Sequence, residues 1–304
     1  MYAELKQVWG ALTGPGGDFE ITTVDVRGNP TRTYKNAPPS LRELWLSSMQ
    51  FAERDYLVYQ DERWTYGEAH AEVAAIASWL VAQGVQPGDR VAIAMRNYPE
   101  YMLLYWAIAS IGATVVGMNA WWVGPEMVYG LKDAEPKVIF IDQERLDRLV
   151  PHLDEVPGSP VLVGVRLTGE APAGLVDYAT VRSHAGTLPE VTIDPDSDAC
   201  IFYTSGTTGH PKGALQTHRG CVNNVMNLAF WARCQAGVQI LLGQAKPEDF
   251  ENPPQGVSLV TTPLFHVTAN NCVAQGGTLT GGKLVLMYKW DAGEALKLIE
   301  REKV

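Results

Sequence analysis

Hydrophobic and polar positions follow two alternating patterns in the first half of the chain. Short apolar runs rich in Val and Ile predict buried strands at 90–95, 113–118 and 137–141. Between them, apolar residues at helical spacing predict helices at 100–111 and 126–133. Strands that alternate with helices are typical of a parallel sheet. The predicted fold class is therefore α/β, with parallel sheets flanked by helices.

Local signals extend this pattern toward the N-terminus. Two β-prone runs, 58–60 and 63–65, are separated by two acidic residues and predict a hairpin. Thr65 and Glu68 have the spacing of a capping box, which predicts that a helix begins there. Asn97 is expected to cap the helix that follows it.

One stretch, residues 101–125, contains no charged residue and is long enough to suggest a membrane span. Small and polar residues interrupt it, among them Ser110, Gly112 and Asn119. A buried helix that stops at Gly112, followed by a buried strand, explains the stretch better than a membrane span does. We therefore expect no transmembrane segment.

Composition limits the possible partners. The chain has 304 residues, 46% of them hydrophobic and 19% charged, with a net charge of −10. This charge argues against nucleic acid or an anionic membrane surface as the main partner, so an anion would need a local positive site. The four cysteines show no Cys-x-x-Cys spacing, and no signal peptide is recognisable at the start. We expect a cytoplasmic protein with reduced thiols.

The most informative stretch is 204–213, which reads Thr-Ser-Gly-Thr-Thr-Gly-His-Pro-Lys-Gly. A β-prone segment precedes it at 199–203 and a shorter one follows at 214–216, so a loop between two strands is expected. Its glycines can turn backbone N–H groups toward one concavity, its hydroxyls are further donors, and Lys212 adds a mobile positive charge. The residues predicted to bind a polyphosphate are Thr204, Ser205, Gly206, Thr207, Thr208, Gly209, Lys212 and Gly213.

Two other interpretations of this loop were weighed. A flexible Gly/Thr loop with one solvated lysine would not require the Pro-Lys-Gly sequence that is present. The P-loop of nucleoside triphosphatases needs Gly-Lys followed by Ser or Thr, whereas Lys212 follows Pro211 and precedes Gly213.

With Tyr203 before it and 216–219 (Gln-Thr-His-Arg) after it, the loop resembles the phosphate-loop signature of the adenylate-forming enzymes. That superfamily includes acyl-CoA synthetases, luciferases and the adenylation domains of peptide synthetases. Its members use ATP to convert a carboxylic acid to an acyl-adenylate and pyrophosphate, and the acyl-CoA synthetases then transfer the acyl group to CoA. The resemblance implies ATP, Mg2+ and CoA as cofactors and co-substrates, and a small-molecule carboxylic acid as the partner. It also implies that Lys212 contacts the departing pyrophosphate.

A second segment, Pro263-Leu264-Phe265-His266, resembles another signature of the family. There the histidine lies beside the forming acyl-adenylate, and the following helix lines the acyl pocket. The resemblance thus implies a catalytic position for His266. The alternative is a packed, hydrogen-bonded core histidine, because a single histidine is weak evidence of chemistry.

Two further features have a structural and a functional interpretation. Asp194, Asp196 and Asp198 suggest a metal, but charged side chains before a strand more often solvate a loop, so we predict no metal ligand. Trp121 and Trp122 stand where the family more often has polar and basic residues. Core or lid aromatics are the favoured interpretation, and a partner or membrane contact is the alternative.

By this resemblance, residues 1–39 are an irregular extension and 40–304 are part of the large N-terminal domain of an acyl-CoA synthetase. We expect one lobe over 40–190 and a phosphate-loop lobe over 191–304. The final helix, capped by Asp291, has a predicted apolar stripe and would normally lead to another strand. The stripe comprises Ala292, Ala295, Leu296 and Ile299. The family's C-terminal domain and its adenine, ribose and magnesium segments are not found. We therefore expect an incomplete domain with an exposed sheet edge that favours homo-oligomers.

The predicted function is that of an AMP-forming acyl-CoA synthetase, with a fatty acid as the favoured substrate. This portion of it would bind nucleotide and have little complete ligase activity. The alternatives are a module that binds nucleotide or acyl group without turnover, and a scaffold subunit. A binding module would lose affinity on Lys212→Ala, and a scaffold would not. The residues leave open whether the acid is fatty, aromatic or steroid-derived.

Overall fold

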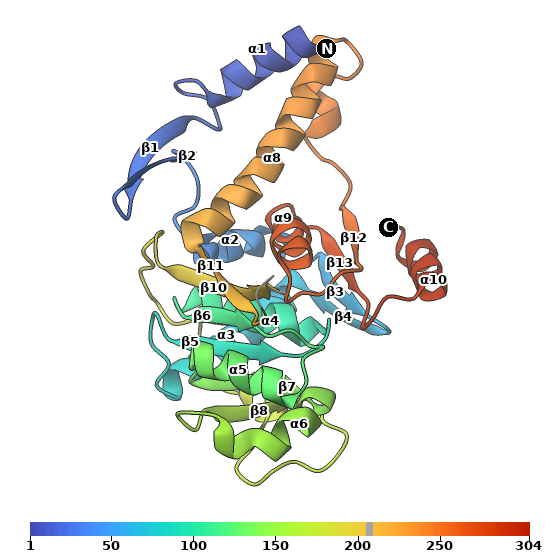
Figure 1. Ribbon diagram of the computed structural model, residues 1–304. Coiled ribbons are helices and arrows are strands. Elements are labelled where there is room, and N and C mark those ends of the chain that lie inside the picture. The colour runs from blue at the N-terminus through green and yellow to red at the C-terminus, as the bar shows by residue number, and fades with distance from the viewer. Residues whose placement is uncertain (205–208) are drawn as a thin grey trace.

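The computed structural model describes residues 1–204 and 209–304, which form two main β-sheets with helices around and between them (Figure 1). The larger sheet has seven strands in the order β11-β10-β6-β5-β7-β8-β9. These are β5 (Arg90–Ala94), β6 (Thr114–Gly117), β7 (Val138–Asp142), β8 (Val161–Val165), β9 (Val176–Asp177), β10 (Asp198–Thr204) and β11 (Lys212–Thr217). All neighbours are parallel except β10 and β11, which are antiparallel. The predicted α/β fold class is confirmed.

The smaller sheet has four strands in the order β12-β13-β3-β4. These are β3 (Asp55–Tyr59), β4 (Glu62–Thr65), β12 (Val257–Val260) and β13 (Lys283–Leu286). The β3–β4 hairpin was predicted, but its sheet partner β13 comes from the other end of the chain. The β10–β11 hairpin likewise joins the larger sheet. The sheets therefore do not follow the expected division into lobes near residue 190, because strand pairing is set by non-local contacts.

The helices predicted at 100–111 and 126–133 are present with slightly different ends, whereas some of the other helices, such as that at 2–13, were not predicted. The longer ones are α1 (Tyr2–Thr13), α3 (Tyr66–Ala82), α4 (Pro99–Ser110), α5 (Gly124–Ala134), α8 (His218–Leu241) and α10 (Ala292–Glu302). The shorter ones are α2 (Leu41–Ser47), α6 (Gln143–Leu149), α7 (Tyr178–Arg182) and α9 (Gln275–Leu279). Short 3-10 helices lie at Ser48–Phe51, Val150–Glu155 and Pro247–Phe250, and a π-helix spans Thr268–Ala274.

Helix α4 explains the uncharged stretch of the sequence. Every residue of α4 is buried, and so is every residue of the neighbouring strand β6. The helix contacts β3 of the smaller sheet as well as β5 and β6 of the larger one, so it lies between the two sheets. The predicted buried helix and strand are confirmed. In the described part of the chain, no helix is both long and apolar enough to cross a bilayer.

The N-terminal segment, 1–39, contains regular secondary structure, which contradicts the prediction of an irregular extension. It forms α1 and a hairpin of β1 (Ile21–Val26) and β2 (Asn29–Tyr34). Helix α1 packs against the outer end of α8, away from both sheets (Figure 1). The rings of Trp9 and Phe230 meet edge to face at a centroid distance of 4.6 Å, and Phe19 packs beside them. Because α1 buries no residue completely and depends on distant α8, its own sequence gives little signal.

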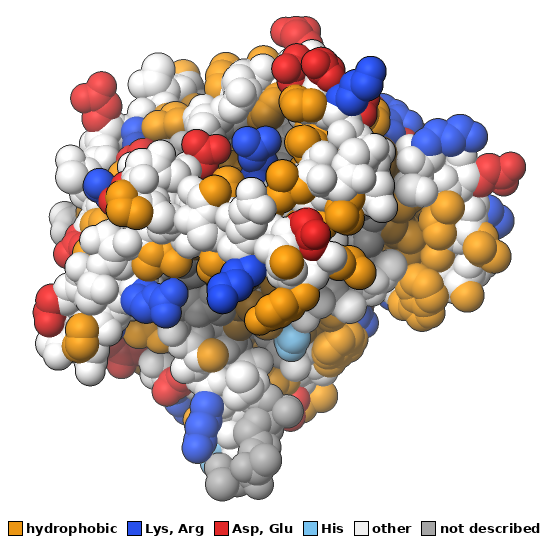
Figure 2. Space-filling model, turned by 90° about the horizontal axis from the view of Figure 1, so that it is seen from above, with side chains coloured by type: hydrophobic (Ala, Val, Ile, Leu, Met, Phe, Trp, Pro, Cys, Tyr) orange, Lys and Arg blue, Asp and Glu red, His pale blue; other side chains and the backbone are white. Residues whose placement is uncertain are grey.

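Helix α10 buries one residue of the predicted apolar stripe, Ala295, and leaves the other three exposed. Ala295 and Leu298 pack against β12 and β13, whereas Leu296 is 69% exposed and Ile299 is 41% exposed. Hydrophobic side chains are accordingly visible on the surface over this helix (Figure 2). Apolar residues lie on both faces of α10, so periodicity alone could not identify the buried one.

Glu302, at the end of α10, joins that helix to the smaller sheet. Its carboxylate accepts hydrogen bonds from Arg63 at 2.8 Å, Arg301 at 2.9 Å and Lys283 at 3.0 Å. Burial would raise the pKa of Glu302, but these three cations outweigh that effect and lower the pKa to about 2. The ionised carboxylate therefore stabilises the packing of α10 on the sheet.

We expect Glu302→Gln to lower the free energy of unfolding at pH 7 by about 2–3 kcal/mol. A carboxylate whose pKa is lowered in the folded state contributes stability above its unfolded pKa of about 4.3, and this is lost as pH falls toward 2. Urea denaturation at pH 7 and pH 3 checks this, with Glu300→Gln on the exposed side of α10 as the control. A difference between Glu302→Gln and the unaltered chain that is equally large at both pH values would contradict the prediction.

Candidate nucleotide-binding site

The predicted phosphate loop connects β10 to β11 across a hairpin, as expected from the sequence. Thr204 pairs with Lys212 at the end of the ladder, and the Thr204 hydroxyl donates to the Lys212 carbonyl at 3.3 Å. The Lys212 residue is exposed. Among the predicted binding residues, the structure places Thr204, Gly209, Lys212 and Gly213. The other four, Ser205, Gly206, Thr207 and Thr208, lie outside the described residues.

Two glycines of the loop are required for different reasons. Gly209 has a φ of 102°, a backbone conformation that other residues rarely adopt. At Gly213, a Cβ atom would lie 2.8 Å from Cγ2 of Ile201 on the neighbouring strand. Gly209 therefore shapes the loop, whereas Gly213 allows β10 and β11 to approach each other closely.

The acidic residues before β10 are engaged by arginines. Arg219 makes two hydrogen bonds to the Asp196 carboxylate, at 2.6 and 3.0 Å, and Arg27 bonds to Asp198 at 2.9 Å. The hydrogen bond from Arg219 also lowers the pKa of Asp196. These contacts favour the structural interpretation of the acidic residues over a metal site. Among the described residues, no group of three His, Cys, Asp or Glu side chains could hold a metal ion.

His266 lies in the turn that connects β12 to the π-helix. It is exposed, and its Nδ1 accepts a hydrogen bond from the backbone N–H of Thr268 at 3.3 Å. Its carbonyl accepts from the N–H of Asn270 at 3.1 Å. The structure thus disagrees with the alternative of a buried core histidine.

Asn97 fastens this turn to the larger sheet. The prediction that Asn97 caps α4 is wrong, because the residue that precedes the helix is Tyr98. Instead the Asn97 side chain accepts from the N–H of Leu264 and donates to the carbonyl of Thr262, both at 2.9 Å. Asn97 is 6% exposed, and its bond to Leu264 is shielded from water. The position of Asn97 just after a parallel strand could have indicated a role at the carboxyl edge of the sheet. From neighbouring residues alone, it was interpreted as a helix cap.

The two candidate segments consequently lie along the same edge of the larger sheet. The phosphate loop follows β10, and Asn97 comes shortly after β5, which runs parallel to β6 and β10. The carboxyl ends of parallel strands meet at one edge, where open α/β sheets usually bind ligands. The structure brings the 262–266 turn to this edge, and Phe265 packs edge to face on Trp121 at 5.2 Å.

A cavity of 310 Å³ lies at this edge, between the two sheets. Its lining includes Arg96, Trp121, Thr262, Phe265, Tyr288 and Lys289. The Arg96 guanidinium lies 5.4 Å from the ring centre of Trp121 and 5.6 Å from that of Tyr288. Trp121 is 55% exposed and Trp122 is buried, so one of the two tryptophans is a core residue and the other lies at the edge. The cavity combines aromatic surface with positive charge.

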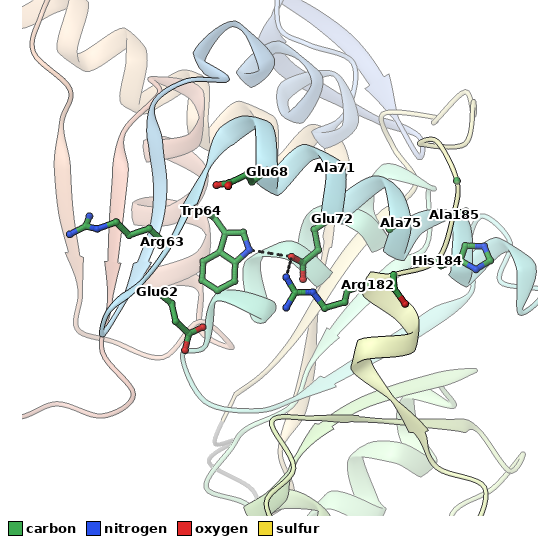
Figure 3. Close-up of a pocket in the computed structure, with 12 residues that line it drawn as sticks. Glu62, Arg63, Trp64, Glu68, Ala71, Glu72, Ala75, Arg182, His184 and Ala185 are labelled. Carbon is green, nitrogen blue, oxygen red and sulfur yellow. Dashed lines mark hydrogen bonds and ion pairs between the residues drawn. The ribbon is translucent and has the colours of Figure 1, made fainter.

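A second cavity, of 790 Å³, lies between α3 and the segment after α7 (Figure 3). Trp64 and Arg182 both point at the Glu72 carboxylate, with hydrogen bonds of 3.1 and 3.0 Å. Tyr178 donates to the same carboxylate at 2.7 Å. None of the predicted site residues that the structure describes lines this cavity, and its buried carboxylate is already satisfied by three donors. We therefore place the candidate site at the carboxyl edge of the larger sheet.

Comparisons with known proteins identify the family of the chain. Residues 45–304 match the family described as AMP-binding enzyme. The chain is 28% identical to 4-coumarate–CoA ligase 2 of Nicotiana tabacum, over 84% of this chain and 44% of that protein. It is 29% identical to the long-chain-fatty-acid–CoA ligase FadD13 of Mycobacterium tuberculosis, over 80% of this chain and 44% of that protein.

A solved structure is also similar to this chain. The inhibitor-bound N-terminal domain of FACL13 from Mycobacterium tuberculosis is 26% identical, with a TM-score of 0.71. The alignment covers 88% of this chain and 62% of that domain. The chain thus spans less than half the length of the curated relatives it matches. The loop at 204–213, the turn at 262–266 and these similarities together show that the chain belongs to the AMP-binding enzyme family, and resembles the N-terminal portion of its acyl-CoA ligases.

Proposed function

We propose that the protein takes part in the ATP-dependent activation of a carboxylic acid to an acyl-adenylate and then to an acyl-CoA. The main support for this proposal is the β10–β11 hairpin. It places exposed Lys212, the first residue of β11, at the carboxyl edge of the larger sheet. In this proposal the substrate carboxylate attacks the α-phosphorus of ATP, and the bond to the departing pyrophosphate breaks. The thiol of CoA then attacks the acyl carbon, loses its proton and releases AMP.

The chain contributes position and charge to this chemistry. Residues 204–213 would hold the β- and γ-phosphates, and the Lys212 ammonium would stabilise the charge that develops on pyrophosphate. Asp196 and Asp198 already pair with arginines, so Mg2+ would enter bound to the phosphates of ATP. His266, exposed on the turn that Asn97 fastens, would lie beside the acyl group.

The identity of the acid is a separate proposal. One relative is named for coumarate and another for long-chain fatty acids, which differ in shape and length. We propose a fatty acid, with an aromatic acid as the alternative. Because the matched part of this chain covers only 44% of each relative, nucleotide binding without turnover remains the alternative function. Cytoplasmic location and self-association stay predictions.

The first test concerns Lys212. We expect Lys212→Ala to weaken binding of ATP and of tripolyphosphate by about 10- to 100-fold, because each hydrogen bond to a charged group contributes about 1.5–3 kcal/mol. Calorimetric titration measures this loss, with Lys297→Ala on the exposed side of α10 as a control. Equal affinity of both variants for tripolyphosphate would contradict the assignment of the phosphate site.

The second test concerns His266. We expect carboxylate-dependent exchange of labelled pyrophosphate into ATP, if this chain supports it, to fall about 10-fold or more in His266→Ala, while tripolyphosphate binding is unchanged. The reason is that His266 would contact the acyl group and not the pyrophosphate. His184→Ala, in the cavity of Figure 3, is the matched control. If His266→Ala weakens tripolyphosphate binding as much as it slows exchange, the assignment is wrong. A chain that binds ATP without exchange would favour the binding module.

A further inference from the structure

One helix that carries none of the predicted site residues contacts both arms of the phosphate-loop hairpin. On α5, Tyr129 and Asp133 are one turn apart, and residues at this spacing lie on the same face of a helix. Tyr129 contacts the arm that returns from the loop, and Asp133 contacts the arm that leads into it. Neither residue belongs to the motifs at 204–213 and 263–266, so the sequence analysis assigns no role to them.

The contacts of Tyr129 lie next to Lys212. Its hydroxyl donates to the Pro211 carbonyl at 3.1 Å, and Pro211 directly precedes Lys212. Its ring stacks on the His210 imidazole at a centroid distance of 5.0 Å and an interplanar angle of 20°. Tyr129 therefore touches two consecutive residues of the returning arm and restrains the backbone just before the lysine.

The contact of Asp133 fixes the other arm. Tyr203, one residue before Thr204, donates its hydroxyl to Asp133 Oδ2 at 2.8 Å. The ring of Tyr203 also packs on buried Trp122 at 5.1 Å. A Cβ at Gly130 of α5 would lie 2.5 Å from the Trp122 ring, so the glycine is needed for this close packing. The arm leading into the loop is thus held by buried contacts.

The returning arm has weaker support from the sheet itself. Strand β11 is at the edge of the sheet, paired only with β10, and its first four residues are exposed. At the mouth of the loop, the side-chain bond between Thr204 and Lys212 is 3.3 Å long. The contacts from Tyr129 join His210 and Pro211, at the loop end of this arm, to α5. At the other end, Gln216 accepts a hydrogen bond from Asn271 at 2.6 Å.

We propose that Tyr129 is a positioning residue for the phosphate site, which sets the location of the Lys212 ammonium through Pro211 and His210 without touching the ligand. The proposal rests on the proposed function of the loop. Through Tyr129, helix α5 would contribute to binding of the β- and γ-phosphates of ATP. Loss of this contribution would weaken binding of ATP but not of AMP.

The test compares Tyr129→Phe, which keeps the ring and loses the hydroxyl, with the unaltered 304-residue chain. The control is Tyr34→Phe, which loses a hydroxyl bond between β2 and Asn227 on α8. Calorimetric titration with ATP, tripolyphosphate and AMP gives the affinities. We expect Tyr129→Phe to bind ATP and tripolyphosphate about 5-fold more weakly, the effect of one hydrogen bond, and AMP equally well. Tyr34→Phe should bind all three as the unaltered chain does.

A second measurement separates positioning from general destabilisation. Amide hydrogen exchange should increase in Tyr129→Phe within 212–217 only, and the melting temperature should shift by no more than about 2 °C. If tripolyphosphate affinity is unchanged in Tyr129→Phe but reduced in Lys212→Ala, the role of Tyr129 is overturned and the phosphate site stands. If affinity for ATP and AMP falls equally, Tyr129 is merely structural. If the unaltered chain does not bind tripolyphosphate, or Lys212→Ala binds it normally, the phosphate site is overturned and the role of Tyr129 with it.

Discussion

The burial of α4 between the two sheets is the constraint on which the rest of the structure depends. A helix that is enclosed on all sides cannot carry unpaired charges, because transferring an ionised group into the interior is very costly. Its one acidic residue, Glu100, is accordingly bonded to Arg166 at 2.9 Å, and Arg166 also binds Glu62 of the smaller sheet. Trp106 of α4 donates to the Tyr56 hydroxyl on β3 at 2.7 Å. The same helix thus joins both sheets, and their relative position follows from its packing.

This arrangement explains why the candidate site forms where two sheets meet. The chain leaves β5, passes Asn97 and enters α4, so the residue that precedes the central helix also faces the turn after β12. Arg145 makes a further connection, since it binds Asp142 at 2.6 Å and lies 3.3 Å from the Tyr288 hydroxyl on the segment after β13. Both contacts are at the carboxyl edge. The edge is therefore rigid in the parts that would position a ligand, while loops supply the ligand-binding groups.

The sequence predicted those features that are encoded in a few neighbouring residues. The Thr65–Glu68 capping box, the β3–β4 hairpin, the buried α4–β6 pair and the loop between β10 and β11 are all local signals, and the structure has them. Predictions failed where a distant partner decides. Helix α1 depends on α8, the pairing of β3 with β13 joins the two ends of the chain, and Asn97 bonds across the sheets. The contacts of Tyr129 could not be predicted either, because a half-buried tyrosine on a helix has no signature until its neighbours are known.

Electrostatics decides whether such an edge can bind a polyphosphate in a protein whose net charge is −10. Carboxylates near the hairpin would repel phosphates, and that of Asp133 lies near the loop, where it accepts a hydrogen bond from Tyr203. Asp196 and Asp198 instead lie before or at the start of β10, at the opposite end of the strand from the loop. Arg219 and Arg27 bind them there, and a paired carboxylate has a weaker field at a distance than a free one. At the carboxyl edge, Lys212, Arg96 and Lys289 contribute positive charge. The acidic surface elsewhere is screened within about 8–10 Å at physiological salt, so the local charges of the edge determine what it attracts.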